Sequence, residues 1–139
     1  MTLREARAVA ATIVVAALIA GCSARYNTEL SAPDGLGPGD PVTNLGAKIG
    51  SVAAVSPLPY GNSAVGFDID YGDQRLVMQD SIMILRNDSG SPSLELLNTN
   101  PISVRAPEGA MIDGASNQSE ADLLMASHGL PGFNAGWRR

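Results

Sequence analysis

The residues that could do chemistry in this 139-residue chain are few. One cysteine, Cys22, and one histidine, His128, exclude disulfide frameworks, the usual zinc sites and a Cys–His nucleophile pair with a spare cysteine. Residues 68–73 suggest a calcium loop, but Gly72 stands where a ligand is needed and no glutamate closes the loop. His128 follows an expected helix end, where capping exposed carbonyls explains it better than acid–base work. We therefore expect no enzyme activity, no metal site and no cofactor.

The first 21 residues have the pattern of a secretory signal. Arg4 and Arg7 precede an uncharged stretch at 8–21, which is shorter than the ~20 apolar residues that span a bilayer. The tetrapeptide LIAG before Cys22 resembles a bacterial lipobox, in which a signal peptidase cuts before the cysteine and its sulfur carries diacylglycerol. We expect a signal peptide over 1–21, lipidation of Cys22 and a tether over 22–25. An ordinary signal peptide and a short uncleaved anchor are the alternatives.

Composition indicates one globular domain that does not bind nucleic acid. The formal charge is −5, and 45% of the residues are hydrophobic. Without residues 1–21, seven basic and thirteen acidic side chains remain. A chain of about 118 residues has a modest core and no room for a large cavity. Such an acidic domain depends on its lipid for membrane attachment.

Alternating and continuous apolar runs predict a small all-β fold. The clearest alternation covers residues 65–71, a strand with one buried face. Similar short runs occupy residues 26–31, 42–45, 48–55, 82–85, 94–97 and 102–105. Turn residues separate them, and Gly46 is expected to supply a positive φ. We expect six or seven short strands in a small antiparallel barrel or sandwich, and we favour the barrel because closure removes unprotected edges.

One short helix is expected near the C-terminus. Ser119 is its expected N-cap, acidic residues follow in the first turn, and Gly129 and Pro131 end it. A helix this short needs tertiary or intersubunit packing. The expected domains are the barrel over 26–113 and the helix with a flexible tail over 114–139.

A glycine-rich pattern between Gly35 and Val52 identifies a resemblance. It resembles the opening signature of the MCE domain, the MlaD-type module of bacterial lipid-transport systems. The runs at 64–71, 77–86 and 94–97 follow in that family's order, so the resemblance covers about residues 26–113. An unrelated β-barrel lipoprotein whose turns need the same glycines is the alternative. The matching turn and core positions are Gly35, Leu36, Gly39, Val42, Gly46, Ile49, Gly50 and Val52.

The resemblance implies a lipid-transport role. MCE domains are seven-stranded barrels in rings of six, with a pore through which phospholipids or other hydrophobic molecules cross the periplasm. Their partners are the permease and ATPase of an ABC transporter. We therefore expect a conduit subunit, homo- or hetero-hexameric, anchored through acylated Cys22 on the periplasmic side of a bacterial membrane, inner or outer. A structural envelope lipoprotein that binds a protein partner and moves no lipid is the alternative.

The expected pore loop departs from the family pattern. Family members usually anchor by a transmembrane helix and carry apolar residues, often paired leucines, in this loop. Here the possible pore loop has no large apolar side chain; it consists of Asn87, Asp88, Ser89, Gly90, Ser91 and Pro92. Either the pore is wide and polar, or its apolar lining comes from Leu123, Leu124 and Met125. Those three residues could equally pack the helix onto its own barrel.

Overall fold

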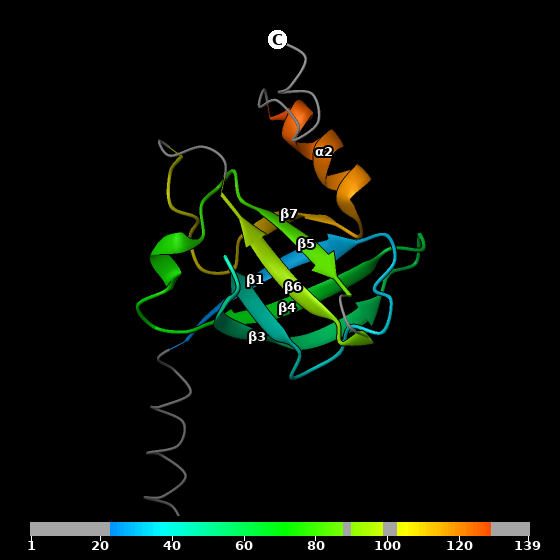
Figure 1. The fold of residues 1–139 in the computed structure, drawn as a ribbon, viewed down its shortest axis with the longest axis horizontal. Helices are drawn as coiled ribbons and strands as arrows, with labels where there is room; N and C mark the ends of the chain where they lie inside the picture. Colours follow the sequence, from blue (N-terminus) through cyan, green and yellow to red (C-terminus); the bar gives the residue numbers. More distant parts are fainter. Residues whose placement is uncertain (1–22, 88–89, 99–102, 129–139) are drawn as a thin grey trace, which may run out of the picture.

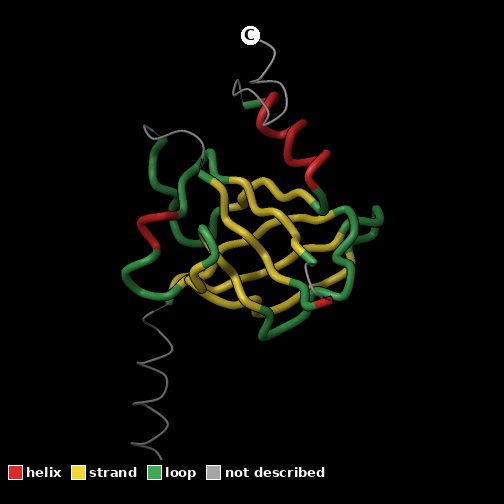
Figure 2. Tube along the Cα trace, viewed as in Figure 1, coloured by secondary structure: helices red, strands yellow, loops and turns green. Residues whose placement is uncertain are grey.

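The computed structural model describes residues 23–87, 90–98 and 103–128, which form a closed seven-stranded barrel with one C-terminal α-helix. Figures 1 and 2 show the strands wrapped around one core and the helix outside them. The expected barrel and its helix are thus confirmed. In chain order the elements are β1 (Ala24–Leu30), β2 (Pro41–Asn44), β3 (Ala47–Pro57), β4 (Ser63–Ile69), the 3₁₀ helix η1 (Gln74–Leu76), β5 (Ile82–Arg86), β6 (Ser93–Leu97), β7 (Met111–Ala115) and α2 (Gln118–Ser127).

The strand pairing is mixed, and the expectation of a purely antiparallel barrel was wrong. The order around the barrel is β1-β4-β3-β2-β6-β5-β7, and three pairs are parallel: β1 with β7, β2 with β6, and β5 with β7. Two of these pairs involve β7, which lies on the other side of β5 from β6. Strand β7 therefore runs in the same direction as β5 and closes the barrel on β1.

The last strand lies later in the sequence than the apolar run at 102–105 suggested. Ser103 and Val104 are outside any strand, and Arg105 forms only an isolated bridge with Met78. Ile102 is outside the described residues. The expectation of a strand there was wrong, because β7 supplies the pairing that closes the barrel.

Side chains fill the barrel interior. The alternation in β4 directs Val65, Phe67 and Ile69 inward, and all three are fully buried. Tyr26 of β1 stacks on Phe67, with ring centroids 6.0 Å apart. Together with the apolar residues of the other strands they form one continuous core.

Strand β5 is apolar along its length because both of its faces are covered. Met83 and Leu85 belong to the barrel core. Ile82 and Ile84 form a second cluster under α2, which contributes Met125 among others. Burial on two faces explains a continuous apolar run where a half-exposed strand would alternate.

The N-cap of helix α2 lies two residues earlier than expected. The side chain of Asn117, not Ser119, is the cap: its Oδ1 accepts a hydrogen bond of 2.9 Å from the backbone N–H of Glu120. The Glu120 carboxylate in turn accepts from the backbone N–H of Ser116 at 3.0 Å. Ser119 therefore lies inside the helix, and the expectation that it is the cap was wrong. Asn117 followed three residues later by glutamate is the spacing of a capping box.

A tight turn and a close strand contact explain two glycines near the start of β3. Leu45 and Gly46, with φ of 52° and 84°, connect β2 to β3, which confirms the expected positive φ at Gly46. Only the glycine adopts this conformation without strain. A Cβ on Gly50 would lie 1.9 Å from the carbonyl oxygen of Asp68 in β4.

Candidate functional site

The two ends of the barrel differ in what they carry. The entry end is the rim where β1 begins: Ala24, the second residue after Cys22, pairs there with Ile69, the last residue of β4. Strands β3, β5 and β7 run in the same direction as β1, from this end towards the other. The far end is the opposite rim, where β5 ends at Arg86 and β6 begins at Ser93. Cys22 itself lies outside the described residues.

The possible pore loop, residues 87–92, belongs to the far end. It closes the antiparallel hairpin of β5 and β6, in which Arg86 pairs with Ser93. Asn87, Gly90 and Ser91 are exposed, and the Asn87 amide donates to the carbonyl of Asp34 at 3.5 Å. Asp88 and Ser89 lie outside the described residues. The described part of the loop thus presents small polar groups and backbone to solvent.

Helix α2 begins beside this loop. Arg86, directly before the loop, donates through Nη1 to the Oε1 of Gln118 at 3.3 Å. The same guanidinium pairs with Glu95 at 2.9 Å. The fold therefore places the possible pore loop and the start of α2 next to each other at the far end. These are the two segments that the sequence indicates as possible parts of a conduit.

The three apolar residues proposed as a lining have different surroundings. Leu123 is 72% exposed, whereas Met125 is buried against β5 and β7. Leu124 lies between these extremes and lines a surface groove of about 230 Å³ with Met111 and Asp113 of β7. Of the three, Leu123 is the side chain most available to a partner or ligand.

The end of α2 is held to β7 by the only histidine. His128 Nε2 lies 2.5 Å from Oδ2 of Asp113, so the imidazole pairs with a carboxylate across to β7 and does not cap helix carbonyls as expected. The backbone N–H of His128 instead donates to the carbonyl of Leu124 at 3.0 Å. This pairing fixes the helix on the outer face of the barrel.

The acidic segment at 68–73 has no metal-site geometry. Asp68 is paired with Arg25, whose Nε lies 2.6 Å from Oδ1 and whose pKa rises because it donates to that carboxylate. Asp73 caps η1 through its backbone position. Across the described ranges, no three His, Cys, Asp or Glu side chains gather around a common point.

The glycine-rich motif occupies turns and core positions around β2 and β3. Its four apolar members, Leu36, Val42, Ile49 and Val52, are buried in the barrel core. Gly35 and Gly39 have positive φ, like Gly46. The motif therefore shapes the barrel and presents no reactive group.

Nothing in the sequence singled out a small cavity at the entry end. Its volume is about 220 Å³, and Tyr71, Gly72, Gln74, Arg75 and Arg105 line it. Arg105 is 30 residues from Arg75, so their placement around one cavity depends on the strand order of the barrel, which the sequence pattern does not reveal.

Comparison with solved structures finds a chain with a similar fold. A chain of the Acinetobacter MlaFEDB complex, in its ATP-bound Vtrans1 conformation, superposes with a TM-score of 0.56 over 68% of this chain and 74% of that chain, at 14% sequence identity. The fold is an MCE-type barrel. No protein-family model and no curated protein sequence matches the chain.

The MCE-type barrel is accompanied by a helix that does not cross membranes. Within residues 23–87, 90–98 and 103–128 no helix is long and apolar enough to span a bilayer. Helix α2, with ten residues, covers β5 and β7 of the barrel.

Proposed function

We propose that this chain is a lipid-anchored subunit of a periplasmic system that transports phospholipid or another hydrophobic molecule. The observation that carries the proposal is the closed MCE-type barrel, which resembles a chain of the MlaFEDB complex. By analogy with MlaD, its partners are the permease and ATPase of an ABC transporter. Its role is to bind and conduct, without catalysis and without a cofactor. Acylated Cys22 holds it on the periplasmic side of a bacterial membrane.

The path for lipid runs between copies of the chain. Side chains such as Tyr26 and Phe67 fill the barrel interior, so a single barrel has no lumen for an acyl chain. A cyclic assembly, by contrast, encloses a tunnel that no single subunit closes. We propose a homo- or hetero-hexamer whose tunnel passes the far end, where the hairpin that carries the loop at 87–92 turns and helix α2 begins.

A photo-crosslinking experiment tests the conduit. Benzoylphenylalanine replaces Ser91 in the full-length protein, expressed in bacteria labelled with radioactive phosphate. After irradiation, radioactive phospholipid attached to the purified protein is expected. A strand of seven residues spans about 20 Å, so the loop lies well away from the entry end and from the bilayer that holds the anchor. Lipid captured at position 91 is therefore cargo.

The matched control places the same crosslinker at Tyr60. This side chain is 67% exposed and lies in the turn between β3 and β4, also at the far end. Lipid attached equally at both positions indicates non-specific contact and contradicts the conduit. A variant with Ser91→Arg is expected to lower capture of lipid by a crosslinker placed at Leu123.

A structural envelope lipoprotein is the second candidate, and the polar loop favours it. Asn87, Gly90 and Ser91 offer no apolar surface to an acyl chain. In that case the crosslinker at position 91 captures a protein and no phospholipid. The same experiment therefore separates the two functions.

A further inference from the structure

The entry end carries exposed apolar side chains that are not packed into the barrel core. Six large hydrophobic side chains are strongly exposed in the described part of the chain, and three of them lie at this rim. Leu45, in the turn between β2 and β3, is 90% exposed, and Tyr71, two residues after β4, is 81% exposed. Val104, whose carbonyl accepts from Gln79 shortly before β5, is 64% exposed. Exposed apolar groups at one rim suggest an interaction surface.

Hydrogen bonds hold two segments at this end to neighbouring parts of the barrel. The backbone N–H of Asp70, after β4, donates to the carbonyl of Ile49 in β3 at 2.8 Å. Asn98, after β6, donates through its amide to the carbonyl of Leu76 in η1. The segment after β4, which carries Tyr71, and η1 are therefore fixed to the folded barrel.

Leu45 is held in a strained conformation without any packing reason. Its φ is 52°, a region that is costly for a branched side chain, and it has almost no contact with the rest of the protein. Asparagine or glycine would suit this turn better. A strained and exposed leucine is explained if the side chain is buried in a partner.

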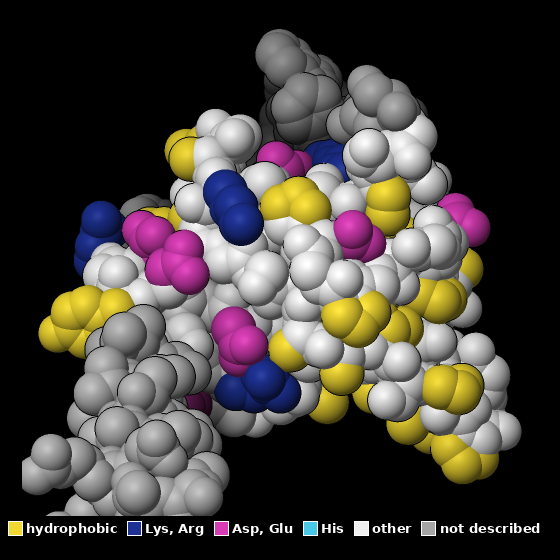
Figure 3. Space-filling model, turned by 90° about the horizontal axis from the view of Figure 1, so that it is seen from below, with side chains coloured by type: hydrophobic (Ala, Val, Ile, Leu, Met, Phe, Trp, Pro, Cys, Tyr) yellow, Lys and Arg dark blue, Asp and Glu magenta, His cyan; other side chains and the backbone are white. Residues whose placement is uncertain are grey.

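Three basic side chains at the same end have no ion-pair partner among the described residues. Arg25 and Arg86 are paired with Asp68 and Glu95, but Lys48, Arg75 and Arg105 are not paired. Lys48 is the second residue of β3, and the two arginines line the entry-end cavity. Figure 3 shows Lys and Arg side chains at the left and centre of the visible face with Asp and Glu side chains beside them, one hydrophobic group protruding at the left edge, and most of the hydrophobic side chains at the right. By the residues named above, the entry end carries both apolar and basic groups.

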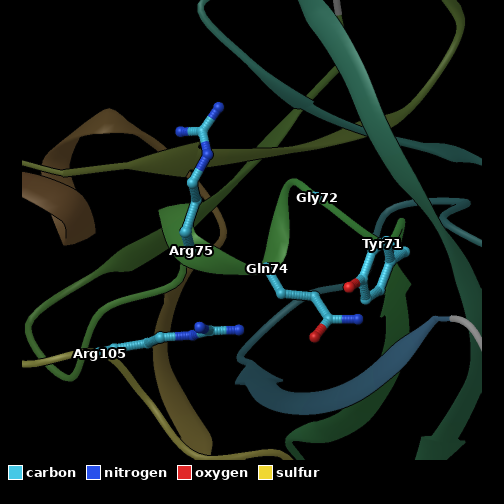
Figure 4. Close-up of a pocket in the computed structure, with 5 residues that line it drawn as sticks. All are labelled: Tyr71, Gly72, Gln74, Arg75 and Arg105. Carbon is cyan, nitrogen blue, oxygen red and sulfur yellow. The ribbon is translucent and has the colours of Figure 1, made fainter.

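The entry-end cavity, lined by η1, the turn before it and Arg105, has hydrogen-bond donors that suit a phosphate group. Figure 4 shows the Arg105 side chain extending towards Gln74 and the Gln74 side chain extending towards Tyr71, while Arg75 points away from them. A guanidinium donates two parallel hydrogen bonds to a phosphate group, and an amide and a phenol add further donors. The volume of about 220 Å³ is below the ~300–1,000 Å³ of pockets for drug-sized ligands, so it fits a head group and not a whole lipid.

Acidic residues at this end restrict the attraction of anions to the immediate surroundings of the basic side chains. Four acidic residues lie on the same rim, one more than the three unpaired basic residues: Asp70, Asp73, Asp80 and Glu108. The described residues of this rim therefore form no large positively charged surface, and they offer nucleic acid or an acidic protein few groups to bind. A membrane offers the apolar interface and the phosphate together, and tyrosine is enriched at that depth.

We infer that the entry end rests on the bilayer, with Leu45, Tyr71 and Val104 in its interface and the Arg105 cavity around a lipid phosphate. The inference rests on the proposed function, because acylated Cys22 lies two residues before Ala24 and places the rim within about 7 Å of the anchor along the chain. The membrane then orients the barrel with its far end pointing away from the bilayer.

Depth measurement by spin labelling tests this orientation. The chain has one cysteine, so when Cys22 is acylated the variant Tyr71→Cys carries the only free thiol. The full-length protein is labelled and reconstituted into phosphatidylcholine–phosphatidylglycerol vesicles. The label at position 71 is expected to collide more with oxygen and less with a water-soluble nickel chelate than a label in the matched variant Tyr60→Cys at the far end. Equal exposure of both labels to the nickel chelate overturns the inference.

Two further arms separate the phosphate contact from its alternatives. The double variant Arg75→Gln, Arg105→Gln is expected to shift the seated population about thirtyfold towards water, and Tyr60→Gln, at the far end, is expected not to. Vesicles of a galactolipid without phosphate should reproduce the double variant. If millimolar inorganic phosphate releases the label from phospholipid vesicles, the cavity binds soluble phosphate and the inference fails.

The spin-labelling experiment tests acylation of Cys22 separately from the membrane contact of the rim. A wild-type chain whose Cys22 accepts the spin label is not acylated, which contradicts the anchor before any depth is measured. An acylated chain with a water-exposed label at position 71 contradicts only the seating of the rim.

Discussion

Replacing Leu45 by asparagine should stabilise the protein while weakening its contact with membranes. A leucine held at a φ of 52° costs about 1–2 kcal/mol relative to a residue that suits this conformation. Because the side chain is 90% exposed, little burial is lost, about 0.3 kcal/mol at most. The variant also creates Asn-Gly, the preferred pair for a two-residue hairpin turn. The expected net gain in the free energy of unfolding is about 1 kcal/mol.

Thermal and urea unfolding measure this gain. For a domain of this size, about 1 kcal/mol raises Tm by roughly 3–6 °C. Val104→Asn is the matched control, since Val104 is also exposed at this rim but has no positive φ, and its stability should stay within about 0.5 kcal/mol of wild type. A Leu45→Asn variant no more stable than wild type would refute the strain argument. Higher stability with unchanged seating on vesicles would show that the strained leucine does not serve the membrane contact.

Three further substitutions test the fold. Gly50→Ala should destabilise by about 3 kcal/mol in urea unfolding, because its Cβ meets a backbone carbonyl of β4, whereas Gly37→Ala, with open space around it, should be neutral. Asn117→Ala should lose about 1 kcal/mol and Ser119→Ala much less; a larger loss at Ser119 would contradict the cap. Burial raises the pKa of Tyr26 above its ordinary value of 10.0, so its stabilising effect is complete below pH 10 and is lost as the pH rises further. Tyr26→Phe should flatten that alkaline loss, and an unchanged slope would exclude Tyr26 as its source.

Much of the barrel is predictable because local patterns and burial agree. The alternation in β4 and the continuous run in β5 are both visible in the sequence, and each reflects how many faces are covered. Strand β7 is not visible in the same way. Its sequence MIDGA contains aspartate and glycine, both poor in strands, and it forms because β5 and β1 pair with it from two sides.

The candidate site is only partly predictable. The loop at 87–92 and the helix that follows β7 are local features, so their residues could be named from sequence. Their meeting through Arg86 and Gln118, and the gathering of Arg105 with Tyr71, depend on long-range pairing. Both contacts follow from the parallel pairing of β7 with β5. Hydrophobic periodicity does not reveal the direction in which a strand runs.

Native mass spectrometry of the full-length protein, extracted in mild detergent, tests the proposed function most directly. One sample gives the mass added at Cys22, the number of subunits and any lipid that co-purifies. A ring of six acylated subunits, alone or with related chains, carrying phospholipid is the predicted result. An acylated monomer without lipid would contradict the conduit, and a chain without acylation would contradict the lipid anchor.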